Sequence, residues 1–228
     1  MKTHYRKQNI GFTTTLFPIL FLCLLLACPD VHAVPRTPDD EIEISCGEEN
    51  PGGQKVLIAY DTIHGSTAEV AENIGTSLCA EGYLVDVRFV GNVDSLDAYD
   101  AVIIGSAIYR FTWLADALAF METNRETLAS MPTAFFIVGA ALFEDTPESR
   151  AAVRQAFVDP VLEEHAAIDP LAVGLFGGAV DFTTNSYTFF EAFVLRVLGL
   201  FLGFTDSADW RDWNSIQDWS EEVGALLR

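Results

Sequence analysis

The sequence predicts a doubly wound α/β domain, built on a five-stranded parallel sheet in the order 2-1-3-4-5. Three observations predict this fold class. Short apolar segments alternate with helical segments from residue 55 onward. Some of these segments are continuously apolar, as parallel strands buried on both faces are. The turns that follow the first and third of them are rich in small residues, which suits the ligand-binding edge of such a sheet.

The first strand and helix are predicted at residues 56–60 and 67–78. The run VLIAY at 56–60 is apolar throughout, which indicates a strand buried on both faces. Residues 67–78 have the periodicity of an amphipathic helix, since one helical face collects Thr67, Val70, Ala71, Ile74 and Leu78. The second strand is predicted at 84–90, where apolar and polar residues alternate. That alternation indicates an edge strand with one wetter face.

The later elements repeat this alternation of strand and helix. Strands are predicted at 101–105, 133–138 and 171–176, and helices at 113–124 and 147–164. A last helix is predicted near the end of the chain, where one face collects Ile216, Trp219, Val223 and Leu226. Strands that alternate with helices over this length imply right-handed crossovers and a parallel sheet.

The residues before this domain are predicted to target and tether it. Residues 1–27 have a basic start and a short apolar run, which is typical of a lipoprotein-type signal peptide. The run ends in Leu-Leu-Ala-Cys, which resembles a lipobox and predicts lipid attachment to Cys28 at the cell envelope. Cleavage after Ala33 is the alternative and would leave a secreted or periplasmic protein. Residues 28–54 are rich in proline and acids and are predicted to be a linker, with the domain at 55–228.

The net charge and the cysteines bear on nucleic-acid binding, disulfide formation and metal binding. The formal net charge is -20, which disfavours binding to nucleic acid. Cys46 and Cys79 remain after the leader is removed, in a compartment that permits disulfides. One bridge is conceivable, but cysteines on a linker and on a helix are expected to be unpaired. No metal-ligand spacing occurs, so no metal is predicted.

The loop after the first strand carries the clearest chemical signal. Hydroxyl groups, a flexible glycine and a helix start suit a phosphate monoester, and we assign the binding to Thr62, Ile63, His64, Gly65, Ser66 and Thr67. No Walker lysine follows, and the GxGxxG fingerprint is absent, which disfavours nucleoside triphosphates and dinucleotides. The alternative is a helix cap rich in serine and threonine that binds nothing.

Two further loops are expected at the same edge of the sheet. Small and aromatic residues follow the third strand, where we place Ser106, Ala107, Ile108, Tyr109 and Trp113 beside a flat ring. Either Tyr109 or Trp113 could stack on that ring, although Trp113 could equally pack its helix onto the sheet. The second wall of the slot is predicted after the fourth strand, from Gly139, Ala140, Ala141, Leu142 and Phe143. A receiver domain is excluded because Ser106 stands where its phosphoacceptor aspartate would be.

Three stretches together resemble the flavodoxin-domain family: YDTIHGSTAEVAENI, YDAVIIGSAIYRFTWL, and the pair GGAVDF and RDWNSIQDW. They are most similar to the branch that includes menaquinone-dependent protoporphyrinogen oxidase, over residues 55–227. The resemblance implies a flavodoxin-like fold with FMN bound through 62–67 and its ring between 106–109 and 139–143. Asp61 replaces the hydroxyl residue common at its position. A carboxylate there repels a phosphate unless it points away.

Residues 187–204 form an apolar segment in which only Glu191 and Arg196 are charged. As a helix it could be buried on the sheet, lie in a dimer interface, or contact a membrane surface. The resemblance favours the membrane, because this region faces the quinone pool in the branch named above. A spanning helix is disfavoured by the interior charges.

These features predict an FMN-binding redox protein, either an oxidoreductase or an electron carrier, anchored to a membrane and with quinone as a candidate partner. The flavin itself would be the catalyst, so no catalytic side chain is predicted. One alternative is a protoporphyrinogen oxidase-like enzyme. Another is a flavodoxin-like lipoprotein that has lost FMN and serves as a binding module. Electron donor, acceptor and oligomeric state are not predicted.

Overall fold

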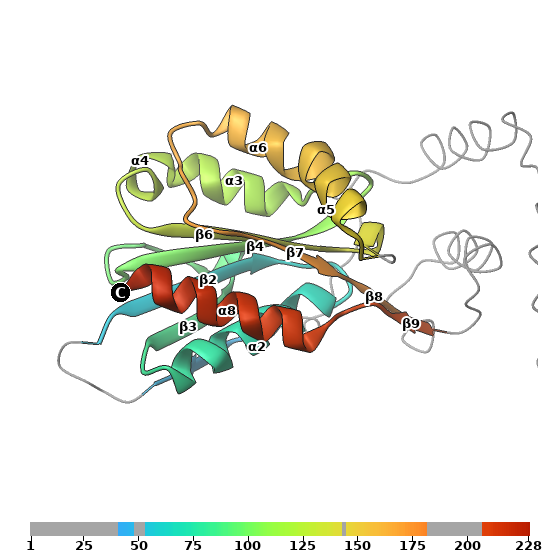
Figure 1. The fold of residues 1–228 in the computed structure, drawn as a ribbon. Helices are drawn as coiled ribbons and strands as arrows, with labels where there is room; N and C mark the ends of the chain where they lie inside the picture. Colours follow the sequence, from blue (N-terminus) through green and yellow to red (C-terminus); the bar gives the residue numbers. More distant parts are fainter. Residues whose placement is uncertain (1–40, 48–52, 143–144, 182–206) are drawn as a thin grey trace, which may run out of the picture.

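The computed structural model describes residues 41–47, 53–142, 145–181 and 207–228. A seven-stranded sheet forms its centre (Figure 1). Its strands are β1 (Ile44–Cys46), β2 (Lys55–Asp61), β3 (Leu84–Phe89), β4 (Ala101–Tyr109), β5 (Thr112–Trp113), β6 (Thr133–Gly139) and β7 (Val173–Gly177). A separate two-stranded ribbon, β8 (Ala179–Asp181) and β9 (Ser207–Asp209), follows β7.

The helices cover both faces of the sheet. They are α2 (Ser66–Ala80), α3 (Ala115–Thr123), α4 (Arg125–Leu128), α5 (Pro147–Val153), α6 (Asp159–Glu164) and α8 (Trp213–Leu227). Short turns occur at η3 (Val90–Asn92) and η4 (Ala140–Leu142), and the π-helical turn η5 (Arg154–Val158) joins α5 to α6. In Figure 1, α2 and α8 lie on one face, and α3 to α6 lie on the other.

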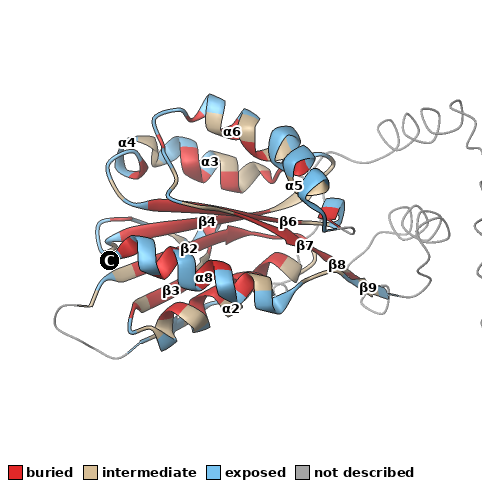
Figure 2. Cartoon of the chain, viewed as in Figure 1, coloured by how far each residue is buried: buried red, intermediate tan, exposed pale blue. Residues whose placement is uncertain are grey.

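The predicted sheet order is confirmed. Neighbouring strands follow the order β3-β2-β4-β6-β7 and all pair in parallel, which is the order 2-1-3-4-5. β2, β4 and β6 are buried along nearly their whole lengths (Figure 2), because helices cover both of their faces. Each large apolar side chain buried there contributes roughly 1.5–3 kcal/mol.

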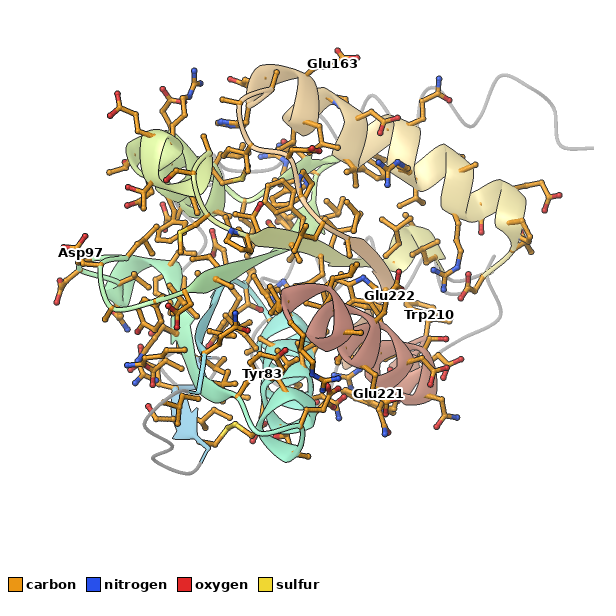
Figure 3. The ribbon with its side chains drawn as sticks, turned by 60° about the vertical axis from the view of Figure 1, so that its left-hand side comes forward. Tyr83, Asp97, Glu163, Trp210, Glu221 and Glu222 are labelled. Atoms are coloured by element: carbon orange, nitrogen blue, oxygen red, sulfur yellow. A yellow bond between two sulfur atoms is a disulfide. The ribbon has the colours of Figure 1, made fainter. Side chains whose placement is uncertain are left out.

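The last helix packs on the sheet as predicted. Trp219 of α8 meets Phe176 of β7 edge to face, with ring centroids 5.6 Å apart. Tyr83, which follows α2, donates a hydrogen bond from its hydroxyl to the Gly224 carbonyl of α8 at 2.6 Å (Figure 3). The aromatic contact and this buried bond fix α8 against the sheet and α2.

Strand β1 differs from the prediction. It lies within the range 28–54 predicted as linker, and it pairs antiparallel with β3, so β3 is not the edge strand. Residues 41–46 (EIEISC) alternate between polar and apolar side chains, as a strand does, but they lie in a proline-rich, acidic stretch whose composition is typical of a linker. The pairing brings Cys46 against α2, where it forms a disulfide with Cys79 at a Cα–Cα distance of 6.0 Å. The expectation that these two cysteines are unpaired is therefore wrong.

Several predicted features lie outside the described residues, namely the signal peptide at 1–27, lipidation at Cys28, the alternative cleavage after Ala33 and the apolar segment 187–204. In the part of the chain that the structure describes, no helix is long and apolar enough to span a bilayer. The remaining differences are local. The helix predicted at 113–124 begins at Ala115, after the short strand β5, and the one predicted at 147–164 is interrupted by η5.

Candidate functional site

The three predicted loops meet at one edge of the sheet. β2, β4 and β6 are adjacent and parallel, so their carboxyl ends emerge together. Asp61 at the end of β2 pairs in register with Ser106 of β4, and Ala107 pairs with Val138 of β6. The chain thus brings the residues at 62–67, 106–113 and 139–142 to a common edge. Phe143 lies outside the described residues.

The first loop is closed by one of its own side chains. Thr62 is buried, and its Oγ1 accepts a hydrogen bond from the Gly65 amide at 3.1 Å. Gly65 has φ 81°, a left-handed conformation that other residues adopt only with strain. Ile63 packs into the core, whereas His64 and Ser66 remain partly exposed. The hydrogen bond within the turn therefore closes it, and the residues at its outer rim are accessible.

The start of α2 presents hydrogen-bond donors that can bind an acceptor group of a ligand. Its N-cap, Gly65, has no side-chain capping bond. By helix geometry, the amides of Ser66, Thr67 and Ala68 have no carbonyl acceptor within the helix. Thr67 is fully buried, and its Oγ1 has no hydrogen-bond partner among the residues that the structure describes. A buried hydroxyl without a partner costs about 1–3 kcal/mol, which a bound anion would relieve. The first loop therefore fits a phosphate group.

Asp61 turns towards a different helix. Its side chain is fully buried, and Oδ2 accepts a hydrogen bond from the Ala117 amide at 3.2 Å. Ala117 lies in the first turn of α3, where the helix dipole favours a negative charge. This bond directs the carboxylate to α3, which answers the expected conflict between Asp61 and a phosphate.

Ser106 also holds the start of α3. Its hydroxyl is buried, accepts a hydrogen bond from the Leu114 amide at 2.9 Å and donates one to the Ala107 carbonyl at 2.9 Å. The side chain predicted to lie beside the ring is thus engaged in the β4–α3 connection. Ala107, Ile108 and Tyr109 are partly exposed and form the accessible part of this loop.

The second loop is a tight hairpin that sequence reasoning missed. Tyr109 pairs with Thr112, and the two residues between them, Arg110 and Phe111, have φ 51° and 67°. Positive φ in two consecutive non-glycine residues is strained backbone, and such strain tends to occur at ligand sites. The Phe111 ring is 53% exposed. Arg-Phe carries none of the usual hairpin signals, which are rich in glycine and asparagine.

Trp113 packs in the core. Its side chain is 1% exposed, its Nε1 donates to the Phe157 carbonyl at 2.8 Å, and its ring meets Phe135 edge to face. Of the two roles considered from the sequence, the packing role is the one that the structure shows. Trp113 is therefore buried beneath the second loop, and its ring is not accessible from the surface.

The third loop lies against the second. Ala140 and Ala141 are exposed in the turn η4, whereas Leu142 is buried. A Cβ atom added to Gly139 would lie 3.2 Å from the Cβ of Ile108, so only glycine allows this approach without a shift. Within the described ranges, no group of three or more histidine, cysteine or acidic residues could hold a metal ion.

Comparison with known families agrees with this geometry. A model of the flavodoxin domain matches residues 57–200. The chain belongs to the flavodoxin domain family. For a member of this family, an edge with a phosphate-type turn and two flanking loops indicates a flavin site.

The chain is also similar to individual proteins. It is 25% identical over 178 residues to protoporphyrinogen IX dehydrogenase [quinone] of Escherichia coli strain K12, a match that covers 75% of this chain and 96% of that protein. Oxidised flavodoxin 1 from Bacillus cereus aligns with a TM-score of 0.48 and 16% identity over 76% of this chain and 99% of that one. A flavodoxin mutant from Pseudomonas aeruginosa aligns with a TM-score of 0.46 and 16% identity, over 76% and 98% of the two chains.

Proposed function

We propose that this flavodoxin-domain protein binds FMN at the carboxyl edge of its sheet and acts as an oxidoreductase or electron carrier. The observation that carries the proposal is the buried hydroxyl of Thr67, which has no hydrogen-bond partner in the described part of the chain and lies at the start of α2, where the N-cap makes no side-chain bond. A phosphate monoester offers the acceptors that this hydroxyl and the first-turn amides need. FMN, when bound, supplies the electron-transfer chemistry.

The three loops would bind different parts of FMN. Thr67 and the amides of the first turn of α2 would hold the phosphate, while Thr62 and Gly65 keep the turn in shape. The ring would lie between the loops at 106–109 and 139–142. Asp61 and Ser106 hold α3 and thereby the hairpin in front of it. The protein thus supplies binding and orientation.

Protoporphyrinogen oxidation is the second candidate. The similarity to protoporphyrinogen IX dehydrogenase [quinone] favours it, and quinone is the acceptor named for that relative. An anionic porphyrinogen would be repelled by a protein of net charge -20. For this reason we rank it below a general FMN redox protein. The third reading, a module that has lost FMN, is weakened because Asp61 binds the amide of Ala117.

We further propose that the protein is exported and held at a membrane by a lipid on Cys28, with processing after Ala33 as the alternative. The Cys46–Cys79 disulfide supports an oxidising compartment, since such bonds are rare in the cytosol. Residues 187–204 would then contact the bilayer surface, where a quinone could exchange electrons. Cys28→Ala should release the protein from membranes, and unchanged membrane association of this variant would contradict the anchor.

The test of cofactor binding is a titration of FMN with the purified full-length chain in detergent. We expect FMN fluorescence to be quenched at one equivalent per chain. A colourless protein that leaves the fluorescence unchanged would contradict the proposal and favour the binding module. Turnover of protoporphyrinogen with a quinone acceptor would then separate the enzyme from the carrier.

A further inference from the structure

Arg211 lies at the base of the β8–β9 ribbon and is held by contacts on three sides. Its Nη1 contacts Glu69 Oε2 at 2.8 Å, and its Nε and Nη2 contact the two oxygens of Asp209 at 2.9 and 2.7 Å. Its guanidinium also lies 4.7 Å from the centre of the Trp213 ring. The side chain is only 9% exposed. A charge held in this way keeps a fixed position relative to α2.

The partner on α2 belongs to the turn that should receive the phosphate. Glu69 lies in the first helical turn, and its amide bonds the Gly65 carbonyl at 3.1 Å. Side chains on a helix lean towards its N-terminus, so a carboxylate at position 69 is expected close to the turn that contains Ser66. A carboxylate in that place opposes a dianion. The ion pair with Arg211 offsets this repulsion.

The ribbon base is also attached to the third loop. The Trp210 amide donates to the Gly178 carbonyl at 3.0 Å, and the Gly178 amide donates to the Gly139 carbonyl at 3.1 Å. Figure 3 shows Trp210 at the edge of the molecule, near the start of α8. Arg211, the next residue, is therefore placed by β7 and the Gly139 loop, and it reaches from there to the helix of the first loop.

Arg211 keeps its charge. Partial burial alone would lower its pKa, but hydrogen bonds to Asp209 and Glu69 outweigh burial and raise the pKa of Arg211. The same contacts with Arg211 hold the pKa of Asp209 below its ordinary value. Both shifts favour the charged forms of Arg211 and Asp209.

We propose that Arg211 is the cation of the phosphate site and acts through Glu69, without touching the ligand. This inference rests on the proposed binding of FMN. Arg211 is then a positioning residue. Its guanidinium holds the Glu69 carboxylate in place and offsets the negative charge of that carboxylate at the start of α2. The role is specific for the phosphate, so it should change the affinity for FMN and leave that for riboflavin nearly unchanged.

The test compares FMN with riboflavin, which lacks the phosphate, in fluorescence titrations of full-length variants at low salt. Arg211→Met should weaken FMN about fivefold and Glu69→Gln should tighten it by about threefold, as a unit charge roughly one helical turn from a dianion would. The double variant should return close to the wild type. Arg211→Lys should retain most of the FMN affinity. Riboflavin affinity should stay within about twofold throughout, and salt should shrink the FMN effects.

Arg125→Met is the matched control. It removes one positive charge from an ion pair with Glu122 on the α3–α4 segment, and in Figure 1 α4 lies at the end of the sheet opposite β9. It should leave FMN affinity unchanged.

The outcomes separate the two proposals. Equal losses for FMN and riboflavin in Arg211→Met, or weaker FMN binding in Glu69→Gln, would overturn the role of Arg211 while FMN binding stands. A wild-type chain that binds neither flavin would instead overturn the proposed function. Should Arg211→Met fail to fold, the tightening expected for Glu69→Gln still decides the question.

Discussion

Thr67 and Asp61 show what single residues contribute to this edge of the sheet. Both are fully buried, yet one hydroxyl lacks a partner among the described residues and one carboxylate binds the start of α3. The sequence predicted the hydroxyl donors of the turn, because residue type and spacing are local properties. It could not predict the direction of Asp61, because that depends on where α3 packs after the sheet has formed.

Replacing Thr67 by valine should separate stability from binding. Valine has nearly the same shape as threonine and removes this buried hydroxyl. Thr67→Val should therefore leave the stability of the apo protein unchanged or raise its free energy of unfolding by about 1 kcal/mol. FMN affinity should fall about tenfold, with little change for riboflavin. Thr133→Val is the control, because Thr133 also buries a hydroxyl without a partner among the described residues but lies at the start of β6. Equal FMN affinity in both variants would contradict the role of Thr67.

Removing the carboxylate of Asp61 should loosen α3. Asp61→Ala should lower the free energy of unfolding by about 1–2 kcal/mol, because the Ala117 amide loses its acceptor. Asp61→Asn retains an acceptor oxygen and should recover most of that loss in urea unfolding. If Asp61→Ala and Asp61→Asn lower the free energy of unfolding equally, the hydrogen bond to α3 does not account for the contribution of Asp61 to stability.

At the scale of elements, the continuous apolar strands and the last helix could be read from the sequence, whereas contacts between distant segments could not. β1 is only three residues long and forms because β3 offers it an edge. The two-residue hairpin at Arg110 and Phe111 lacks glycine, so the sequence does not predict β5, and it leaves both packing and stacking open for Trp113. Trp113 is buried because its ring packs against Phe135 of β6 and its Nε1 donates to the Phe157 carbonyl of η5.

The Cys46–Cys79 disulfide, which links β1 to α2, should contribute strongly to the stability of the fold. It closes a loop with a sequence separation of 33 residues, for which restriction of the unfolded chain gives about 3–4 kcal/mol. Cys79→Ser should therefore lower the melting temperature by about 10 °C, and a reductant should do the same to the wild type. FMN affinity should not change, because Cys79 lies near the far end of α2 from the phosphate turn. A wild type insensitive to reductant would contradict this account.

The segment before β1 should respond to alkaline pH. The Tyr60 hydroxyl donates to the Ile42 carbonyl at 2.8 Å and accepts from the Ile42 amide at 2.5 Å. Burial raises the pKa of Tyr60 to about 12, although the bond from the Ile42 amide acts to lower it. Below the ordinary pKa of 10.0 both folded and unfolded chains keep the proton, so stability is unaffected. As pH rises towards about 12, the unfolded chain ionises first and stability falls. Urea unfolding of Tyr60→Phe should show a shallower loss, and an identical slope would count against this role.

At the scale of the whole molecule, an acidic protein is proposed to bind a dianion. The net charge of -20 opposes FMN at long range, and the helix start and local hydrogen bonds must overcome that field. Raising ionic strength from about 10 to 300 mM shortens the Debye length from about 30 Å to below 8 Å. FMN should therefore bind more tightly at the higher salt, while riboflavin should not respond. Tighter FMN binding at low salt would show that local cations dominate the site.

The most direct test of the central claim is a crystal structure of the protein with FMN. We expect the phosphate to accept hydrogen bonds from Thr67 Oγ1 and from the amides at the start of α2, with Asp61 still bound to the Ala117 amide. A phosphate bound elsewhere, or an Asp61 carboxylate turned into the space in front of α2, would contradict the claim.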